Sequence, residues 1–360
     1  MGLFDTTLRD DQTLFRNEEA LDFDFIPKLL PYREQQQRAV ATLIQPLLTG
    51  RNGRNLLVFG PPGVGKTAAI RWVLNDLEET SDDVYIIYIN CWQKNTTFQI
   101  VAEICDQLGY KFTQNKRTDE LFTVIKNIVN KKAVVFAFDE IDKVTEYDFL
   151  YTLLEEVLKK TIILITNFKE WADEMDIRIK SRLVPTLMPF EHYNPEETFG
   201  ILKQRRESAF VPGVWDEIAF KLIADKAAQL KDIRTGLFMM REAGLHAESK
   251  SQRKITEECA RAAIEKVSLL EVKKSEELEE ETKDILKLIK THSNQKIGDL
   301  FKKFQDAGGK ASYKTFQRKV EKLVEGGFIH AQKMIGGAEG TTTILTSKSD
   351  AKLSDFSEKK

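Results

Sequence analysis

The stretch Gly60–Thr67, which reads GPPGVGKT, has residue types suited to holding a phosphate group. It satisfies the pattern G-x-x-x-x-G-K-[ST] at every fixed position, between the apolar run 55–59 and a helical pattern. The glycines let backbone N–H groups point at a phosphate, Lys66 would reach the β- and γ-phosphates, and the Thr67 hydroxyl would hold Mg²⁺. We predict that a nucleoside triphosphate binds to Gly60, Pro61, Pro62, Gly63, Val64, Gly65, Lys66, Thr67 and Ala68.

Acidic residues end a second apolar run, 134–138, with Asp139 and Glu140 adjacent. We expect this run to be a strand beside the one that precedes the phosphate loop, so that Asp139 meets the Mg²⁺ held by Thr67. Glu140 is then placed to polarise an attacking water as a general base. The alternative is an acidic strand end that faces solvent.

Four further polar residues are candidates for the same chemistry. Asn167 follows the apolar run 162–165 and could hydrogen-bond a water or the γ-phosphate; a turn residue is the alternative. Arg178 and Arg182, four apart, could reach a neighbouring subunit's phosphate site or form a charged surface helix. Arg234, at the start of a helix, could reach the γ-phosphate or lie at the surface.

The composition is that of a folded protein with more than one domain. The chain has 360 residues, 31% of them charged, and a net charge of −2, so any contact with nucleic acid must depend on a local basic patch. Its three cysteines lack metal-ligand spacing, which favours reduced thiols and a cytoplasmic location. No apolar run approaches the length of about 18 residues that a membrane-spanning helix requires, so we expect no membrane association.

Alternation of apolar strands with helices predicts an α/β fold with a doubly wound parallel sheet. The strands are expected at 55–59, 84–90, 133–138 and 161–166, after an N-terminal arm over 1–30. After Pro195 the strand patterns stop and four helical ones follow. We therefore predict three domains: an α/β nucleotide-binding domain at 1–194, an all-helical domain at 195–272, and a third domain at 273–360.

The third domain has the element order of a winged helix, with helices near 281–291, 297–307 and 312–325, then two strands around a glycine-rich turn at 336–340. Between residues 296 and 333 it has nine Lys and Arg against four Asp and Glu. We predict that the helix 312–325 enters the major groove of DNA. The predicted DNA contacts in this domain are Tyr313, Lys314, Gln317, Arg318 and Lys333. A winged helix that contacts protein instead is the alternative.

Taken together, GPPGVGKT, FAFDEID, the ITN strand end, IKSRL and KDIR resemble the motifs of an AAA+ ATPase. More narrowly, the chain resembles the archaeal origin-recognition (Orc/Cdc-type) AAA+ replication initiators. The narrower resemblance is carried by residues 14–36, by INCWQKNTTFQI at 89–100, and by a winged helix after an AAA+ lid.

The resemblance implies a role for each matching residue. Asn167 matches the first sensor and Arg234 the second, while Arg182 is the better arginine-finger candidate and Arg178 the runner-up. Two sets complete the match: Tyr32 and Arg33 in the box that borders the adenine, and Trp92, Gln93 and Lys94 in an insertion that touches origin DNA. The family usually has Gly where this chain has Lys231, and its sensor strand often ends Ser-Asn rather than Thr166-Asn167.

The function implied is that of an ATP-dependent initiator of DNA replication. Such a protein binds double-stranded origin DNA, recruits an MCM-type replicative helicase, and assembles with itself or with paralogous initiators at the nucleoid. Its cofactors would be ATP or ADP and Mg²⁺, with slow hydrolysis as a switch. Two alternatives remain: a clamp-loader-like remodelling ATPase, and a signalling NTPase whose winged helix does not bind DNA.

Overall fold

Residue contacts divide the chain into two compact units, 1–263 and 264–360. The structure is a computed structural model that describes residues 13–168, 171–276, 280–309, 311–325, 328–334 and 342–347. The two boundaries predicted between the three domains, at 194/195 and 272/273, remain predictions. Among the described residues, no helix combines the length and apolar character needed to cross a membrane.

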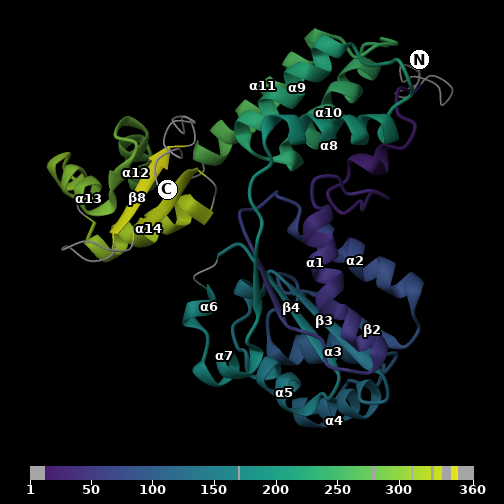
Figure 1. The fold of residues 1–360 in the computed structure, drawn as a ribbon. Helices are drawn as coiled ribbons and strands as arrows, with labels where there is room; N and C mark the ends of the chain where they lie inside the picture. Colours follow the sequence, from purple (N-terminus) through teal and green to yellow (C-terminus); the bar gives the residue numbers. More distant parts are fainter. Residues whose placement is uncertain are drawn as a thin grey trace. The chain divides into compact units, whose positions relative to one another are not determined.

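A five-stranded parallel sheet forms the centre of the first unit (Figure 1). Its strands lie in the order β2-β3-β4-β1-β5, and all four pairings are parallel. This confirms the predicted parallel α/β fold. The bounds are β1 Leu56–Phe59, β2 Val84–Asn90, β3 Ala133–Asp139, β4 Lys160–Thr166 and β5 Thr186–Pro189. The edge strand β5 was not predicted, because it is four residues long and mostly exposed.

The expectation that the strand ending at Asp139 lies beside the phosphate-loop strand is wrong. β4 lies between them and pairs with β1 on one side and β3 on the other. Six of the seven residues of β4 are buried, as a strand covered on both faces and both edges requires. Asp139 therefore reaches the phosphate loop across the carboxyl edge of the sheet and not from a neighbouring strand.

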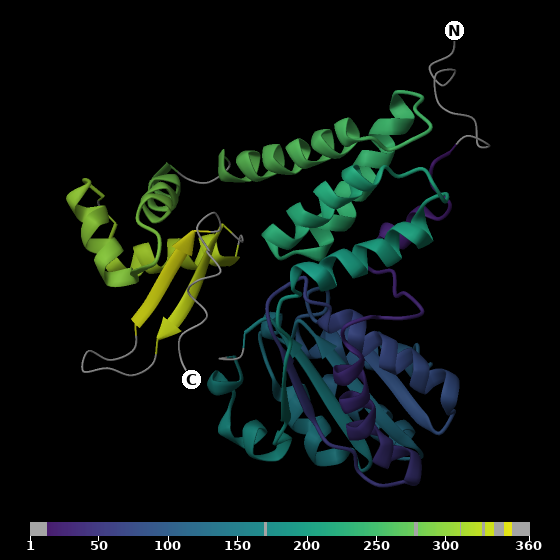
Figure 2. The same cartoon turned by 45° about the horizontal axis from the view of Figure 1, so that its top comes forward.

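Helices cover both faces of this sheet (Figures 1 and 2), and an apolar core lies between the sheet and the helices on each face. Helices α1 (Glu34–Ile44) and α2 (Lys66–Thr80) pack on the face that presents Val58, Val135 and Ile163. The opposite face presents Leu57, Phe136 and Leu164 to a second set of helices. That set comprises α3 (Thr97–Gln107), α4 (Thr118–Val129), α5 (Asp148–Glu156) and α7 (Ile177–Leu183), with the short α6 (Trp171–Glu174) before α7.

The helices predicted after Pro195 are present. They are α8 (Pro195–Ala209), α9 (Glu217–Leu230), α10 (Ile233–Ser249) and α11 (Glu257–Glu276), the last of which continues into the charged run at 273–281. Asn194, Asp216 and Asp232 cap the first three by accepting a backbone N–H. The described part of the arm packs on these helices, where the ring of Phe15 lies tilted against that of Phe210 at 4.8 Å between centroids.

The second unit has the helices and strands predicted for a winged helix, together with the unpredicted two-residue strand β6. Its elements are α12 (Glu280–Thr291), β6 (Gln295–Lys296), α13 (Ile297–Asp306), α14 (Tyr313–Glu325), β7 (Ile329–Met334) and β8 (Thr342–Ser347). The strands form an antiparallel sheet in the order β6-β8-β7, and Leu300, Phe316 and Leu345 lie in the core beneath them. The predicted turn at 336–340 lies outside the described residues.

Candidate nucleotide-binding site

A cavity lies at the carboxyl edge of the parallel sheet, against the phosphate loop. The space between its lining residues is about 1050 Å³ and is partly open to solvent. Residues from six separate parts of the chain line it: the arm, the phosphate loop with the start of α2, the end of β3, the end of β4, α8 and α10.

The side chains of Asp232 and Tyr193 lie close against the glycines of the phosphate loop. Gly63 and Gly65 have φ of +80° and +85°, which side chains rarely adopt. A Cβ on Gly63 would come within 2.7 Å of Asp232 Oδ1, and one on Gly65 within 2.6 Å of the Tyr193 hydroxyl. Glycine at these two positions is therefore required by backbone conformation and by space. The cavity is lined by Pro62, Gly63, Gly65, Lys66, Thr67 and Ala68, whereas Gly60, Pro61 and Val64 do not line it.

Lys66 lies at the start of α2 with only 7% of its surface exposed. Its ammonium donates to the carbonyls of Gly60 and Pro61 at 2.7 and 2.8 Å, and to Asn167 Oδ1 at 2.8 Å. Burial lowers the pKa of Lys66 to about 8; the nearby charge of Asp139 raises this pKa and that of Arg234 lowers it. An anion beside the ammonium would favour its charged form.

Thr67 and Asp139 are in direct contact, although the strands that precede them, β1 and β3, are not neighbours. The Thr67 hydroxyl donates to Asp139 Oδ2 at 2.6 Å. The same carboxylate oxygen accepts from the Tyr88 hydroxyl at 2.7 Å. Burial and the charge of Asp139 raise the pKa of Tyr88, so its hydroxyl remains a donor. Two hydroxyls thus orient one carboxylate oxygen.

Glu140 lines the cavity in a left-handed backbone conformation, with φ of 53° and ψ of 44°. Its N–H donates to Asp139 Oδ1 at 2.9 Å, which helps to hold this unfavourable conformation. Burial, and then the charges of Asp139 and Asp142, raise the pKa of the Glu140 carboxyl. A carboxylate of raised basicity suits general-base chemistry.

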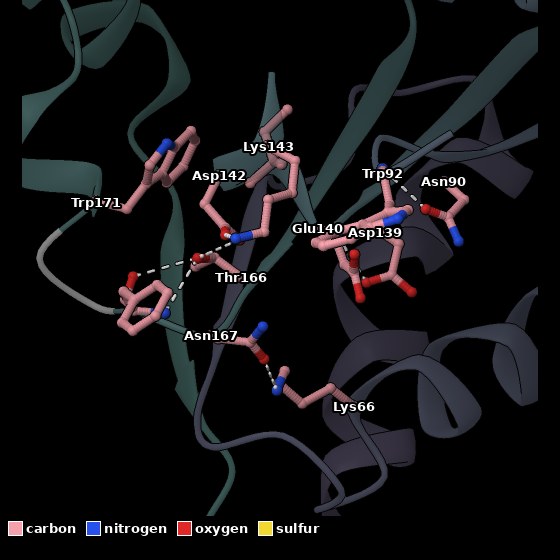
Figure 3. A network of polar contacts seen from close by, with 12 residues as sticks. Lys66, Asn90, Trp92, Asp139, Glu140, Asp142, Lys143, Thr166, Asn167 and Trp171 are labelled. Atoms are coloured by element: carbon pink, nitrogen blue, oxygen red, sulfur yellow. Dashed lines mark hydrogen bonds and ion pairs between the residues drawn. The ribbon is translucent and has the colours of Figure 1, made fainter. Parts of the chain in front are cut away.

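A polar network extends from Lys66 along the end of β4 (Figure 3). Asn167 accepts from Lys66, and the neighbouring Thr166 hydroxyl donates to Asp142 Oδ1 at 3.0 Å. Asp142 also pairs with Lys143 at 3.2 Å, and the Lys143 ammonium lies 5.5 Å from the centroid of the Trp92 ring. The hydroxyl that contacts Asp142 is common to Thr and Ser, so the departure from Ser-Asn leaves this contact possible.

Arg234 lines the cavity from the start of α10. Asp232, which caps this helix, accepts from the Arg234 N–H at 3.0 Å and from the Thr235 hydroxyl at 2.7 Å. Lys231 ends α9 in the left-handed conformation, with φ of 54°. Glycine adopts that conformation more readily than lysine does.

Tyr32 and Arg33 do not line the cavity. Arg33 is buried behind the phosphate loop, where it donates to the carbonyls of Val64 at 3.2 Å and Glu191 at 2.7 Å and lies 3.9 Å from the Tyr193 ring centroid. Tyr32 lies against Gly200 on α8. The apolar end of the cavity is instead formed by Phe23, Phe25, Ile26, Leu30, Ile201, Ile233 and Leu237.

Arg178 and Arg182 lie on α7 and are absent from the cavity lining. Arg182 pairs with Glu155, and Arg178 with Asp176 at 2.8 Å. Both guanidinium groups lie over the ring of Tyr151, at 4.9 Å for Arg182 and 6.0 Å for Arg178. Both arginines are therefore exposed, each is paired with an acidic side chain, and neither lines the cavity of its own chain.

The β2–α3 connection that contains Trp92 and Lys94 covers residues 91–96, without a helix or strand. The predicted insertion is therefore a short loop. Trp92 is 65% exposed, and Lys94 pairs with Glu103 at 3.4 Å.

The helix α14 has an apolar, buried face and a basic, exposed face. Ser312 caps it, Phe316, Val320 and Leu323 are buried, and Lys314 and Arg318 are exposed. Tyr313 is 41% exposed and packs edge-on against Phe301, while Gln317 is half-buried. Lys319 differs from its basic neighbours, because it is buried and pairs with Glu281 at 2.9 Å. Lys333 lies on β7 opposite Thr343.

Sequence reasoning missed several residues around the cavity. Arg71 lies one helical turn after Thr67, so the helical period of α2 would have placed it on the same face. Arg205, which donates to the carbonyls of Ala20 and Phe25 at 3.0 and 2.9 Å, had no such signal, because its partners are about 180 residues away. Burial lowers the pKa of Arg205 to about 10.

Comparison with known proteins agrees with this geometry. A family model described as "AAA domain" matches residues 49–179, and one described as "Cdc6 AAA+ ATPase-type lid domain" matches residues 199–265. The ORC1-type DNA replication protein of Pyrococcus furiosus is 33% identical over 285 residues, which is 74% of this chain and 68% of that protein.

Two solved structures share the fold. The Aeropyrum pernix ORC2 protein, in its ADPNP-ADP complexes, has a TM-score of 0.71 at 19% identity and covers 93% of this chain and 95% of its own. The Aeropyrum pernix ORC1 protein in complex with DNA has a TM-score of 0.67 at 24% identity, with 93% and 94% covered. The chain belongs to the archaeal Orc/Cdc6 family of AAA+ ATPases, the ORC1-type DNA replication proteins.

Proposed function

We propose that the protein is an ATP-dependent initiator of DNA replication that binds origin DNA and recruits the replicative helicase. One observation carries the nucleotide-dependent part: Lys66, Thr67, Asp139, Glu140, Asn167 and Arg234 line one cavity although they come from four separate segments. The family relationship to ORC1-type DNA replication proteins supports the replication part.

ATP would bind with its phosphates at the loop and its base toward the apolar end formed by the arm, α8 and α10. The ammonium of Lys66 and the guanidinium of Arg234 supply positive charge at the phosphate end. The Aeropyrum pernix ORC2 protein, whose fold is shared, is described in complexes with ADPNP and ADP.

The oxygens of Thr67 and Asp139 suit Mg²⁺. No group of three or more His, Cys, Asp or Glu residues in the described part of the chain could hold a metal by itself. Mg²⁺ in nucleotide sites commonly uses one or two protein oxygens with phosphates and waters as its other ligands. Bound there, Mg²⁺ would supply charge neutralisation at the phosphates.

Hydrolysis of ATP would use Glu140 to accept a proton from water and Asn167 to orient that water. The raised pKa of the Glu140 carboxyl favours proton acceptance, and the bond from Asn167 to Lys66 places the amide beside the phosphate-binding group. Arg182 would complete the site of a neighbouring subunit, with Arg178 as the second candidate, because both lie outside their own cavity. Mixing Glu140→Gln protein with Arg182→Ala protein should restore hydrolysis if the finger acts in trans.

Double-stranded DNA would contact the exposed basic face of α14 through Lys314 and Arg318. Tyr313, Gln317 and Lys333, and Trp92 and Lys94 of the first unit, are further proposed contacts. The Aeropyrum pernix ORC1 protein, whose fold this chain shares, is described in complex with DNA. The proposed partners are an MCM-type helicase and further copies or paralogues of the chain. The proposed location is the nucleoid.

Footprinting on intergenic DNA of the source organism, in parallel with ATP and with ADP, tests the proposal. We expect a protected site whose strength depends on the nucleotide and is insensitive to nucleotide in Lys66→Ala protein. Lys132→Ala, an exposed lysine outside the cavity, is the matched control. Rapid ATP turnover without site preference would instead favour a remodelling motor, and nucleotide binding without DNA protection would favour a signalling NTPase.

A further inference from the structure

Tyr88 lies behind the phosphate-binding cavity and not in its lining. It is on β2, the edge strand of the sheet, and packs against the core on the side of α2. Its hydroxyl donates to Asp139 Oδ2 at 2.7 Å, the oxygen that also accepts from Thr67 at 2.6 Å. Tyr88 therefore reaches the nucleotide site only through another residue.

The backbone of Tyr88 is held from outside the sheet. Gln107, the last residue of α3, accepts from the Tyr88 N–H at 3.1 Å and donates to the Tyr88 carbonyl at 2.9 Å. These two bonds satisfy the edge-strand groups that have no neighbouring strand. Glu103 accepts from the Gln107 amide at 3.0 Å, so the clamp is itself anchored to α3.

The ring of Tyr88 is held from the side of α2. The guanidinium of Arg71, which lines the cavity, lies 5.4 Å from the Tyr88 ring centroid. Backbone, ring and hydroxyl of Tyr88 each have a partner from a different element: α3, α2 and the end of β3. Such an arrangement fixes the position of the hydroxyl against Asp139.

We propose that Tyr88 is a positioning residue that holds the Asp139 carboxylate in the orientation needed to share Mg²⁺ with Thr67. This inference rests on the proposed function of the cavity. Outer hydrogen-bond partners of metal-binding carboxylates hold their orientation, and their removal typically lowers metal affinity about 10- to 100-fold. Tyr88 would thus affect nucleotide binding only when Mg²⁺ is present.

The substitution Tyr88→Phe removes the hydroxyl and keeps the ring. Tyr85→Phe is the matched control, because Tyr85 is on the same strand but packs against the core on the opposite face of the sheet. Affinity for a fluorescent ATP analogue is measured in EDTA and across a MgCl₂ titration, with thermal melting of each protein without nucleotide. We expect Tyr88→Phe to need about tenfold more Mg²⁺ for half of the affinity gain, with unchanged affinity in EDTA.

The result separates this inference from the proposed function. If wild-type protein binds the analogue and responds to Mg²⁺, but Tyr88→Phe responds identically, the positioning role is wrong and the nucleotide site stands. If wild-type protein binds no analogue, the proposed function fails first.

A double-mutant cycle distinguishes this positioning role from a general loss of folding. In an Asp139→Asn background, Tyr88→Phe should cause no further change in the Mg²⁺ response, because its partner is already altered. Equal effects in both backgrounds, or an equal loss of affinity in EDTA, would overturn the proposal.

Discussion

The phosphate-binding cavity and the basic face of α14 organise their polar residues differently. In the cavity, Lys66 and Asp139 are buried, and each bonds to side chains from other segments of the chain. On α14, Lys314 and Arg318 are exposed, and a single helix places both.

This difference has an energetic consequence. A buried charge needs its partners, so a change at one residue of the cavity affects the groups bonded to it. An exposed charge on a helix acts mainly through long-range attraction and is screened by salt. Changes in the cavity should therefore be large and specific, and changes on α14 smaller and salt-dependent.

The largest effect is expected for Glu140→Gln. Loss of the proposed general base should slow ATP hydrolysis by about 10²- to 10⁴-fold, while nucleotide affinity stays near that of wild type. Phosphate release and binding of a fluorescent ATP analogue measure the two quantities. Glu146→Gln, at an exposed glutamate outside the cavity, should hydrolyse ATP normally. Wild-type hydrolysis by Glu140→Gln would show that another group is the base.

The buried side of α14 should be sensitive to Phe316→Ala. Phe316 is fully buried against Phe301 and Phe304, so truncation should destabilise the second unit by about 3–5 kcal/mol. Hydrogen exchange, followed separately in each unit, measures this loss. Lys322→Ala on the exposed side should leave exchange unchanged. Faster exchange around the phosphate loop in Phe316→Ala protein would show that the substitution also destabilises the first unit.

The exposed side of α14 should govern DNA affinity. Lys314→Ala with Arg318→Ala should weaken binding by roughly tenfold at low salt and reduce the slope of log affinity against log salt by about 2. Titration of a fluorescent duplex at several salt concentrations measures both. Lys287→Ala with Lys290→Ala on α12 removes the same charge outside the proposed surface. An equal loss in this control would mean that only net charge matters.

The smallest effects are expected for substitutions of two residues that cap helices. Asp232 and Asp216 cap α10 and α9, so replacing either by Ala should lower stability by about 1 kcal/mol. Only Asp232 also lies against Gly63 of the phosphate loop. Asp232→Ala alone should weaken nucleotide binding, by a few-fold in a fluorescence titration. Equal nucleotide affinity in the two variants would show that this contact does not matter.

Most of the fold was predictable because local patterns determine it. The strands from 84–90 and 133–138 and the helices after Pro195 follow from apolar runs and helical spacing, and the structure places them within a few residues. The strands β5 and β6 were missed because four and two residues carry little pattern. The order of the strands was also mistaken, because it depends on how the chain returns to the sheet.

The residues of the candidate site also fall into two groups, those that the sequence indicated and those that it did not. The phosphate loop, the acidic strand end and the Asp232-capped helix were recognisable as contiguous motifs. The contribution of Tyr88 and Arg205 was not, because each bonds to a partner at least 50 residues away. For Tyr32 and Arg33 the motif was recognisable in the sequence, but neither residue lines the cavity.

By itself, the sequence determined which residues can hold phosphate, which helix presents a basic face, and which segments form strands. These properties depend on residue type and on spacing along a helix or strand. The packing of the folded chain was needed to show that β4 separates β1 from β3, that Tyr88 donates to Asp139, and that Lys319 is buried against Glu281. Those contacts join residues distant in the chain, and only the packing of whole elements brings them together.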